Sequence, residues 1–128
     1  MRHPLQIARL KRVAGTDGRR AWYKVTQSDG RPPYGRGSYY LPRGARPGQW
    51  HRWGGRLELC VRGFHATQRP GFWLDQQRLR FLKNCRLFVV EVRGCGEMDG
   101  RKAVFRYLRF TREVRRGSSE WRRLCRLK

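Results

Sequence analysis

Acidic residues are scarce in this chain. Nine Asp and Glu stand against thirty-one Lys and Arg among 128 residues, which gives a formal net charge of +22 and an isoelectric point near 11.6. Net charge says little about a fold, but a domain this basic repels itself unless a polyanion neutralises it. Nucleic acid is the commonest polyanion, ahead of an anionic membrane or an acidic protein surface. The shortage of acids therefore favours a polyanionic partner.

Lysine is scarce as well, since Arg supplies twenty-six of the positive charges and Lys only five. Guanidinium groups form bidentate bonds to phosphate and stack on bases, whereas an ammonium acts as a hydrated point charge. A GC-rich coding bias accounts for part of the ratio of Arg to Lys. It does not account for the missing acids, so the composition still indicates phosphate recognition.

Long apolar runs and paired cysteines are also missing. No segment approaches the roughly 20 apolar residues of a membrane span, and the first fifteen residues hold no apolar run typical of a signal peptide. The four cysteines, at positions 60, 85, 95 and 125, form no Cys-x-x-Cys pair, so a zinc ribbon is not supported. We expect a cytoplasmic protein with free, partly buried thiols, no cofactor, no bound metal and no membrane partner.

The length and the 38% hydrophobic content predict a single domain over residues 1–128 with one core. The patterning predicts an α+β fold: a small twisted, mostly antiparallel sheet with one packed helix, a long Arg/aromatic loop and a basic C-terminal helix. The expected strands are 20–27, 57–61, 86–92 and 101–115, with a helix as the alternative for 101–115. Residues 5–13 are compatible with a further strand, and a short one is expected near Trp50. The expected helices are 72–83, ended by Asn84, and 118–128. In 57–61 we expect Leu57, Leu59 and Val61 to point inward. The run 86–92 is apolar on both faces, which predicts a central strand.

The motifs "WYKV", "PGQWH", "LELCVRGFHAT" and "LFVVEVRG" follow one another in an order that resembles an uncharacterised bacterial and phage domain family. Its members share a Leu-Cys-x-x-Gly-(Phe/Val)-His-Ala core, preceded by a Tyr-Lys strand and followed by a (Val/Ile)-Glu-(Val/Leu)-x-Gly strand. The resemblance covers roughly residues 21–115. It implies a single compact domain with Tyr23, Cys60, Gly63, His65 and Glu91 in shared positions, and it brings no activity with it. The Arg density and the basic C-terminal helix depart from the family pattern.

Cys60 and His65 admit three interpretations. Zinc would need two further ligands, which His51, Cys85 and Cys95 could supply, but Cys-x4-His alone is a weak signal. A Cys nucleophile with a His base needs the two side chains within hydrogen-bond reach and an orienting acid, such as Glu58 or Glu91. The interpretation that we favour is structural: Gly63 permits an unusual backbone conformation, and Cys60 and His65 are buried and hydrogen-bonded where a strand ends.

An enzymatic alternative takes Tyr23, His65 and Glu91 together. A Tyr-Lys strand, a Gly-Phe-His-Ala segment and a later Glu on a strand are similar in plan to ADP-ribosyltransferase-like folds. In such enzymes an early His or Arg holds a nicotinamide dinucleotide, and the Glu stabilises the cationic sugar that develops during transfer. The sequence lacks a recognisable binding triad of that kind.

The segment 31–56 combines six Arg with five aromatic residues and contains no acid. Arg that contacts phosphate, interleaved with rings that stack on bases, is the pattern of a sequence-tolerant site for single strands. We expect Trp50 to cap the core. The candidate contacts in this segment are Arg31, Arg36, Tyr39, Tyr40, Arg43, Arg46, Arg52 and Trp53.

The closing strand and tail add a second set of cations, among which Glu113 and Glu120 are the acids. The candidate contacts here are Arg106, Arg109, Arg112, Arg115, Arg116, Arg122, Arg123 and Arg126. On a continuous strand, alternate Arg would point to opposite faces, so we expect an edge or protruding strand with one basic, solvated side.

These observations predict a nucleic-acid-binding protein, with RNA slightly ahead of DNA because splayed single strands suit exposed aromatic side chains. It would act as a small subunit or modulator of a larger nucleoprotein complex. The alternatives are the ADP-ribosyltransferase-like enzyme and a basic module that docks on an acidic protein surface.

Overall fold

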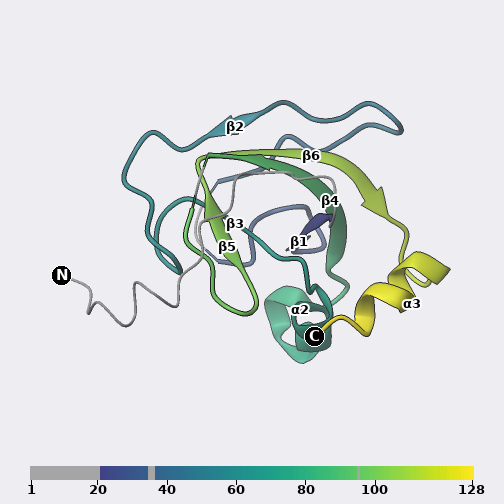
Figure 1. Ribbon diagram of the computed structural model, residues 1–128. Helices are drawn as coiled ribbons and strands as arrows, with labels where there is room; N and C mark the ends of the chain where they lie inside the picture. Colours follow the sequence, from purple (N-terminus) through teal and green to yellow (C-terminus); the bar gives the residue numbers. More distant parts are fainter. Residues whose placement is uncertain (1–20, 35–36, 95) are drawn as a thin grey trace.

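The computed structural model describes residues 21–34, 37–94 and 96–128, and the strands among them form two antiparallel sheets (Figure 1). The larger sheet has the order β1-β4-β6-β2, and the smaller one pairs β3 with β5. The strands are β1 (Trp22–Thr26), β2 (His51–Arg52), β3 (Phe64–Ala66), β4 (Arg86–Arg93), β5 (Ala103–Phe105) and β6 (Tyr107–Val114). The helical segments are α2 (Gly71–Leu74), the 3-10 turns η1 (Asp75–Arg78) and η2 (Arg80–Leu82), and α3 (Ser119–Cys125). This architecture confirms the predicted α+β class.

Strand β4 is central in the larger sheet, as its apolar sequence predicts. It pairs with β1 on one side and with β6 on the other. Phe88, Val90 and Val92 point to one face of the sheet, and Leu87 points to the other; all four are buried. The sheet is therefore covered on both faces, which explains why β4 does not show the alternation of a half-exposed strand.

The first core lies between the larger sheet and the β3–β5 pair. Phe88 and Phe110 meet edge to face, with ring centroids 5.2 Å apart, and Trp22 meets Phe105 in the same way at 4.9 Å. Ala66 of β3 belongs to the same buried cluster. Each fully buried side chain of this size contributes roughly 1.5–3 kcal/mol, so this face anchors the β3–β5 pair to the sheet.

The second core joins the opposite face of the sheet to the helices, which lie close together in Figure 1. Trp121 and Leu124 of α3 are buried against Leu87 and Val114. The side chain of Ser118 accepts a hydrogen bond from the Trp121 backbone N–H at 3.1 Å, which caps the helix N-terminus. The predicted amphipathic helix near the C-terminus is confirmed.

The predicted strand 57–61 is wrong. Leu57–Val61 leads through a tight turn closed by a bridge between Glu58 and Arg62, and Val61 is 62% exposed. The paired strand begins only at Phe64, after two residues with positive φ, Cys60 at 71° and Gly63 at 109°. At Gly63 a Cβ atom would lie 2.5 Å from Val104 Cγ2, so the close approach of β5 requires glycine there. Alternation alone missed this turn.

The predicted helix 72–83 is interrupted. One turn of α-helix passes into two 3-10 turns, and Leu79 between them is extended, with ψ of 135°. This tighter winding places Leu74 and Leu82 in the second core with Leu79 packed against them. Tertiary packing therefore outweighs helix propensity in this segment. Asn84 ends it with φ of 57°, as expected of a residue that tolerates the left-handed region.

The predicted single strand 101–115 is two strands in two sheets. β5 pairs with β3 and β6 pairs with β4, with Arg106 between them. The guanidinium of Arg106 donates hydrogen bonds to the carbonyl oxygens of Trp53 and Gly55 at 2.8 and 2.9 Å. The break is thus fixed by a contact more than fifty residues away in sequence. β2 pairs only with Tyr107 and Leu108, so beyond Leu108 no described strand pairs with the outer side of β6, and this part is an edge as expected.

The segment before β3 has little regular structure. Residues 31–34 and 37–56 are irregular apart from the short strand β2, as predicted for this segment. The possible strand at 5–13 lies outside the described residues. Within the part of the chain that the structure describes, no helix is both long and apolar enough to cross a bilayer.

Candidate functional site

The basic loop, defined here as residues 37–56, contains β2 and carries four Arg and no acid. Arg43 and Arg46 close a tight turn, because the backbone N–H of each donates to the carbonyl oxygen of the other at 2.9 Å. Their side chains and that of Arg52 are exposed, and none makes an ion pair or hydrogen bond with another described residue. These guanidinium groups are available to an external anion.

Tyr40 is the exposed aromatic side chain of this loop, at 53% accessibility. One face of its ring stacks on His51, with centroids 4.7 Å apart and planes 22° from parallel. The Tyr40 backbone N–H also donates to His51 Nε2 at 3.0 Å. Burial and the nearby charge of Lys24 lower the pKa of His51. His51 is therefore a neutral support that holds the Tyr40 ring in place at the surface.

The structure places the other predicted aromatic contacts differently. Tyr39 is half-buried against Phe110, with ring centroids 4.7 Å apart, and burial raises the pKa of its phenol. Trp53 is half-buried, and its indole N–H donates to the Arg56 carbonyl oxygen at 3.0 Å. Tyr39 thus packs against the core, and Trp53 stabilises the loop through its hydrogen bond to Arg56.

Trp50 does not cap a core as expected. Two guanidinium groups, those of Arg93 and Arg109, lie 4.8 and 5.0 Å from its ring centroid. Arg93 is on β4 and Arg109 on β6, and Glu91 of β4 accepts a hydrogen bond from Arg109 at 2.7 Å. A cation–π arrangement of this kind stabilises the surface by about 0.5–1 kcal/mol per contact.

Four of the predicted arginine contacts donate hydrogen bonds from their guanidinium groups to other parts of the molecule. Arg106 holds the basic loop, and Arg109 pairs with Glu91. Arg112 forms a bidentate pair with Glu120, with both nitrogen–oxygen distances at 2.8 Å. Arg116 donates to the Gln77 side chain and the Cys85 carbonyl oxygen, with its guanidinium over the Trp121 ring. These four guanidinium groups therefore stabilise the fold through contacts within the chain.

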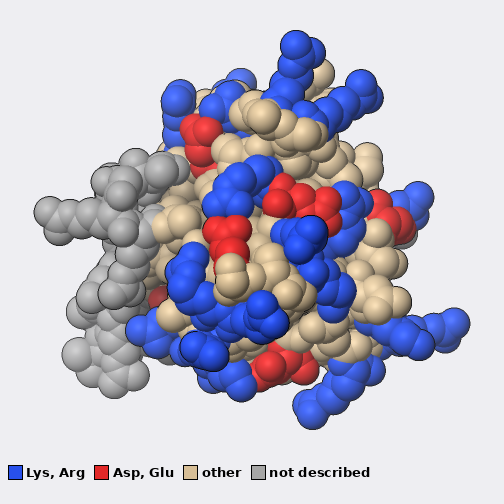
Figure 2. Space-filling model, turned by 90° about the vertical axis from the view of Figure 1, so that its right-hand side faces the viewer, with Lys and Arg blue, Asp and Glu red and all other residues tan. Residues whose placement is uncertain are grey.

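The other predicted arginines lie on the surface. Arg31 forms an exposed ion pair with Asp29 at 3.5 Å, and Arg123 lies 3.9 Å from Glu120. Arg115, Arg122 and Arg126 are exposed without a side-chain partner among the described residues, and Arg36 lies outside them. Figure 2 shows the side of the molecule that carries α3, where Lys and Arg side chains are spread widely and acidic groups form separate patches among them.

A hollow of about 590 Å³ lies at the turn of the basic loop. Tyr39, Tyr40, Arg43 and Arg46 are among its lining residues, and no Asp or Glu is among the described residues that line it. The hollow brings together two tyrosines and two arginines that the sequence predicts as contacts.

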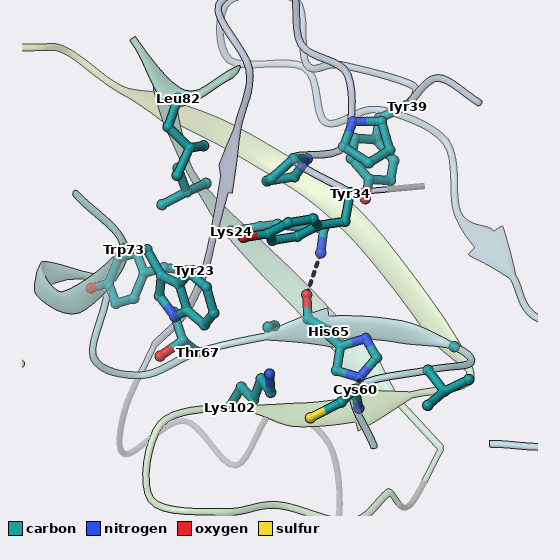
Figure 3. A pocket seen from close by; sticks show the side chains of 16 residues that line it. Tyr23, Lys24, Tyr34, Tyr39, Cys60, His65, Thr67, Trp73, Leu82 and Lys102 are labelled. Atoms are coloured by element: carbon teal, nitrogen blue, oxygen red, sulfur yellow. Dashed lines mark hydrogen bonds between the residues drawn. The ribbon is translucent and has the colours of Figure 1, made fainter. Parts of the chain in front are cut away.

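A second cavity, of about 550 Å³, lies between β1, β3 and the segment 32–34 (Figure 3). Lys24, Tyr39, His65 and Lys102 line it, and Tyr39 also lines the first hollow. The ammonium of Lys24 donates a hydrogen bond to the His65 carbonyl oxygen and lies 5.6 Å from the Tyr39 ring centroid. Burial lowers the pKa of Lys24 to about 8. No Asp or Glu lines the cavity within the described part of the chain.

His65 is neutral and tied to the backbone. Its Nε2 accepts a hydrogen bond from the Cys60 N–H at 2.7 Å, and a backbone hydrogen bond joins it to Gly63. Burial, followed by the charges of Lys24 and Lys102, lowers its pKa to about 4. A ring nitrogen that already accepts a backbone N–H cannot also take the proton of a thiol, so this geometry does not form a Cys–His dyad. Cys60 itself is exposed, which corrects the expectation that it is buried.

The three residues of the enzymatic alternative are not brought together. Tyr23 and His65 line the cavity of Figure 3, whereas Glu91 is absent from its lining and is paired with Arg109. Among the described residues, no group of three or more His, Cys, Asp or Glu side chains could hold a metal ion.

Sequence reasoning missed Lys24 and Lys102 as site residues. A signal for Lys24 was present, because Trp22 and Thr26 on the same face of β1 are both buried. A lysine between two inward positions of a strand breaks the apolar pattern and marks a functional position. Lys102 carries no comparable signal, since it follows a turn that Asp99 closes by accepting its backbone N–H at 2.9 Å.

Comparison of the chain with protein-family models, curated proteins and solved structures finds no match.

Proposed function

We propose that the protein binds single-stranded nucleic acid through the basic loop, with RNA ahead of DNA. The observation that carries this proposal is the set of exposed guanidinium groups of Arg43, Arg46 and Arg52, which have no internal partner among the described residues. Arg43 and Arg46 line one hollow together with the exposed ring of Tyr40. Phosphate contacts from Arg supply affinity, and a ring supplies stacking that tolerates any base.

A duplex is a poorer fit than a single strand. Among the described helices, α3 is the longest at seven residues and Trp121 and Leu124 on it are buried, so its apolar side is already occupied. Tyr40 stacks on His51 through one face only, and a base can approach the other. Bases are accessible for stacking when a strand is splayed, and RNA is recognised mainly in that state.

The experiment is fluorescence anisotropy of the full chain with a short labelled RNA strand, the same DNA strand and a duplex. On a single strand, each neutralised phosphate contributes about −0.7 to the slope of log K against log salt. Replacing Arg43, Arg46 and Arg52 together with Gln should flatten this slope by about two units and weaken all sequences alike.

A matched control removes the same charge elsewhere. Arg78, Arg80 and Lys83 are exposed near the 3-10 turns, and changing all three to Gln should leave most of the slope intact. Equal effects from the two triple variants would refute the basic loop as the binding site. Equal affinity for polyglutamate and for RNA would instead show a module that docks on acidic proteins.

A further inference from the structure

The cavity of Figure 3 has the size and chemistry of a ligand site. Its volume of about 550 Å³ lies within the range of roughly 300–1,000 Å³ that is typical of small-molecule pockets. Lys24 and Lys102 supply its positive charge, while Tyr34, Tyr39 and Trp73 supply aromatic walls. Because no carboxylate lines it in the described part of the chain, an anion inside would meet two ammonium groups and no opposing carboxylate from these residues.

The two ammonium groups have unused donor capacity. An ammonium carries three N–H donors, and Lys24 directs one of them to the His65 carbonyl oxygen. Lys102 lies 5.5 Å from the Trp73 ring centroid and forms no ion pair with another described residue. A cation held away from water without a counter-ion is costly, and a bound anion offsets that cost. The low pKa of Lys24 reflects this uncompensated position.

The rim of the cavity offers a stacking surface. Tyr34 meets Phe81 in an edge-to-face contact, with ring centroids 5.1 Å apart, and is 67% exposed, so most of its ring is accessible to a ligand. Figure 3 shows the Tyr34 ring across the cavity from His65, beside the Lys24 side chain. A planar base and a phosphate can therefore be held a few ångströms apart.

The cavity also adjoins the proposed strand-binding surface. Tyr39 lines both the cavity and the hollow at Arg43 and Arg46. A strand bound along the basic loop would therefore reach the cavity at Tyr39.

We propose that this cavity holds one unpaired nucleotide, with its phosphate at Lys24 and Lys102 and its base against Tyr34. The inference rests on the proposed function, because the nucleotide belongs to the strand that the basic loop binds. It adds a second, smaller site that recognises a single nucleotide unit.

The test is calorimetric titration of the full chain with adenosine 5′-monophosphate, inorganic phosphate and adenosine, at low salt and pH 7. The mononucleotide should bind with one-to-one stoichiometry, at least about tenfold more tightly than either fragment. Lys102→Gln should weaken the mononucleotide at least about tenfold, whereas Lys83→Gln, an exposed lysine outside the cavity, should leave it unchanged. Tyr34→Ala should weaken the mononucleotide but not phosphate. Thermal melting checks that each variant is folded. If Lys102→Gln does not fold, Tyr34→Ala still tests the cavity, because it replaces an exposed side chain.

The outcomes separate the two proposals. If RNA binds and mononucleotide does not, or if both cavity variants bind mononucleotide like the intact chain, the cavity site is refuted while the basic loop stands. If phosphate binds as tightly as mononucleotide, the base contact and therefore the nucleotide assignment are wrong. If mononucleotide binds and RNA does not, the strand-binding function fails and only a free-nucleotide site remains.

Discussion

The ammonium of Lys24 on β1 donates a hydrogen bond to the backbone carbonyl oxygen of His65 on β3, forty-one residues away in sequence. This contact joins the larger sheet to the smaller one at the cavity. It also places a positive charge where no carboxylate from the described residues balances it. A buried charge without a counter-ion costs stability, and a bound anion would offset that cost.

Replacing Lys24 with Met tests whether this charge lowers stability and contributes to anion binding. At pH 7 the buried charge is absent from the variant, so we expect its free energy of unfolding to be unchanged or higher by about 1–2 kcal/mol, despite the lost hydrogen bond. Mononucleotide binding should fall at least about tenfold. Thermal melting and calorimetry measure the two effects, and a variant destabilised by more than about 2 kcal/mol would show that Lys24 is held for the fold.

Lys24 also predicts a stability change at alkaline pH. Its pKa is about 8 in the folded protein and 10.5 for an unburied lysine, so between these values the unfolded chain holds the proton that the folded chain has lost. Stability should therefore rise as pH increases from about 8 towards 10. Urea unfolding across this window should show the rise in the intact chain and a smaller one in Lys24→Met.

His65 predicts a loss of stability at acid pH. Its folded pKa of about 4 lies below the 6.5 of an unburied histidine, so the unfolded chain takes up a proton first as pH falls. Stability should decline between pH 6.5 and 5, by at most about 1.4 kcal/mol per pH unit. The pKa of His51 is lowered too, so His51→Gln serves as the comparison. A pH profile of His65→Gln as steep as that of the intact chain would contradict the assignment.

Tyr40 and Tyr39 should separate stacking from packing. Tyr40→Ala removes an exposed ring, so we expect weaker single-strand binding by about 1–3 kcal/mol with an unchanged salt slope and a stability change within about 0.5 kcal/mol. Tyr39→Ala removes a ring packed on Phe110 and should cost about 2–4 kcal/mol of stability. Anisotropy and urea unfolding on both variants check the contrast, which reversed effects would overturn.

Arg106 and Arg115 should separate structural from available charges. Arg106→Gln leaves the carbonyl oxygens of Trp53 and Gly55 without their donor and should destabilise the fold by about 1–3 kcal/mol. Arg115 is exposed with no side-chain partner among the described residues, so Arg115→Gln should change stability by less than about 0.5 kcal/mol. The two variants lose the same charge, and equal unfolding free energies would show that the Arg106 contacts contribute nothing.

Several features of this protein follow from its sequence alone. The run of apolar residues in β4 is long enough to need cover on both faces, and it is central. The spacing of Trp121 and Leu124 after Ser118 is sufficient for a capped amphipathic helix. The balance of charge is set by composition, so the expectation of a polyanionic partner required no coordinates. These properties depend on local spacing or on sums, which a sequence contains in full.

Only the tertiary structure decided which cations remain available to a partner. Arg109 is taken by Glu91 and Arg86 by Glu113, eighteen and twenty-seven residues away, because the β4–β6 register aligns those strands. The turn at Cys60 and the break at Arg106 likewise come from β5 and the basic loop approaching distant segments. Lys24 became a cavity residue because β3 packs beside β1. An ion pair or a cavity depends on distances across the fold, and no local pattern in the chain fixes those distances.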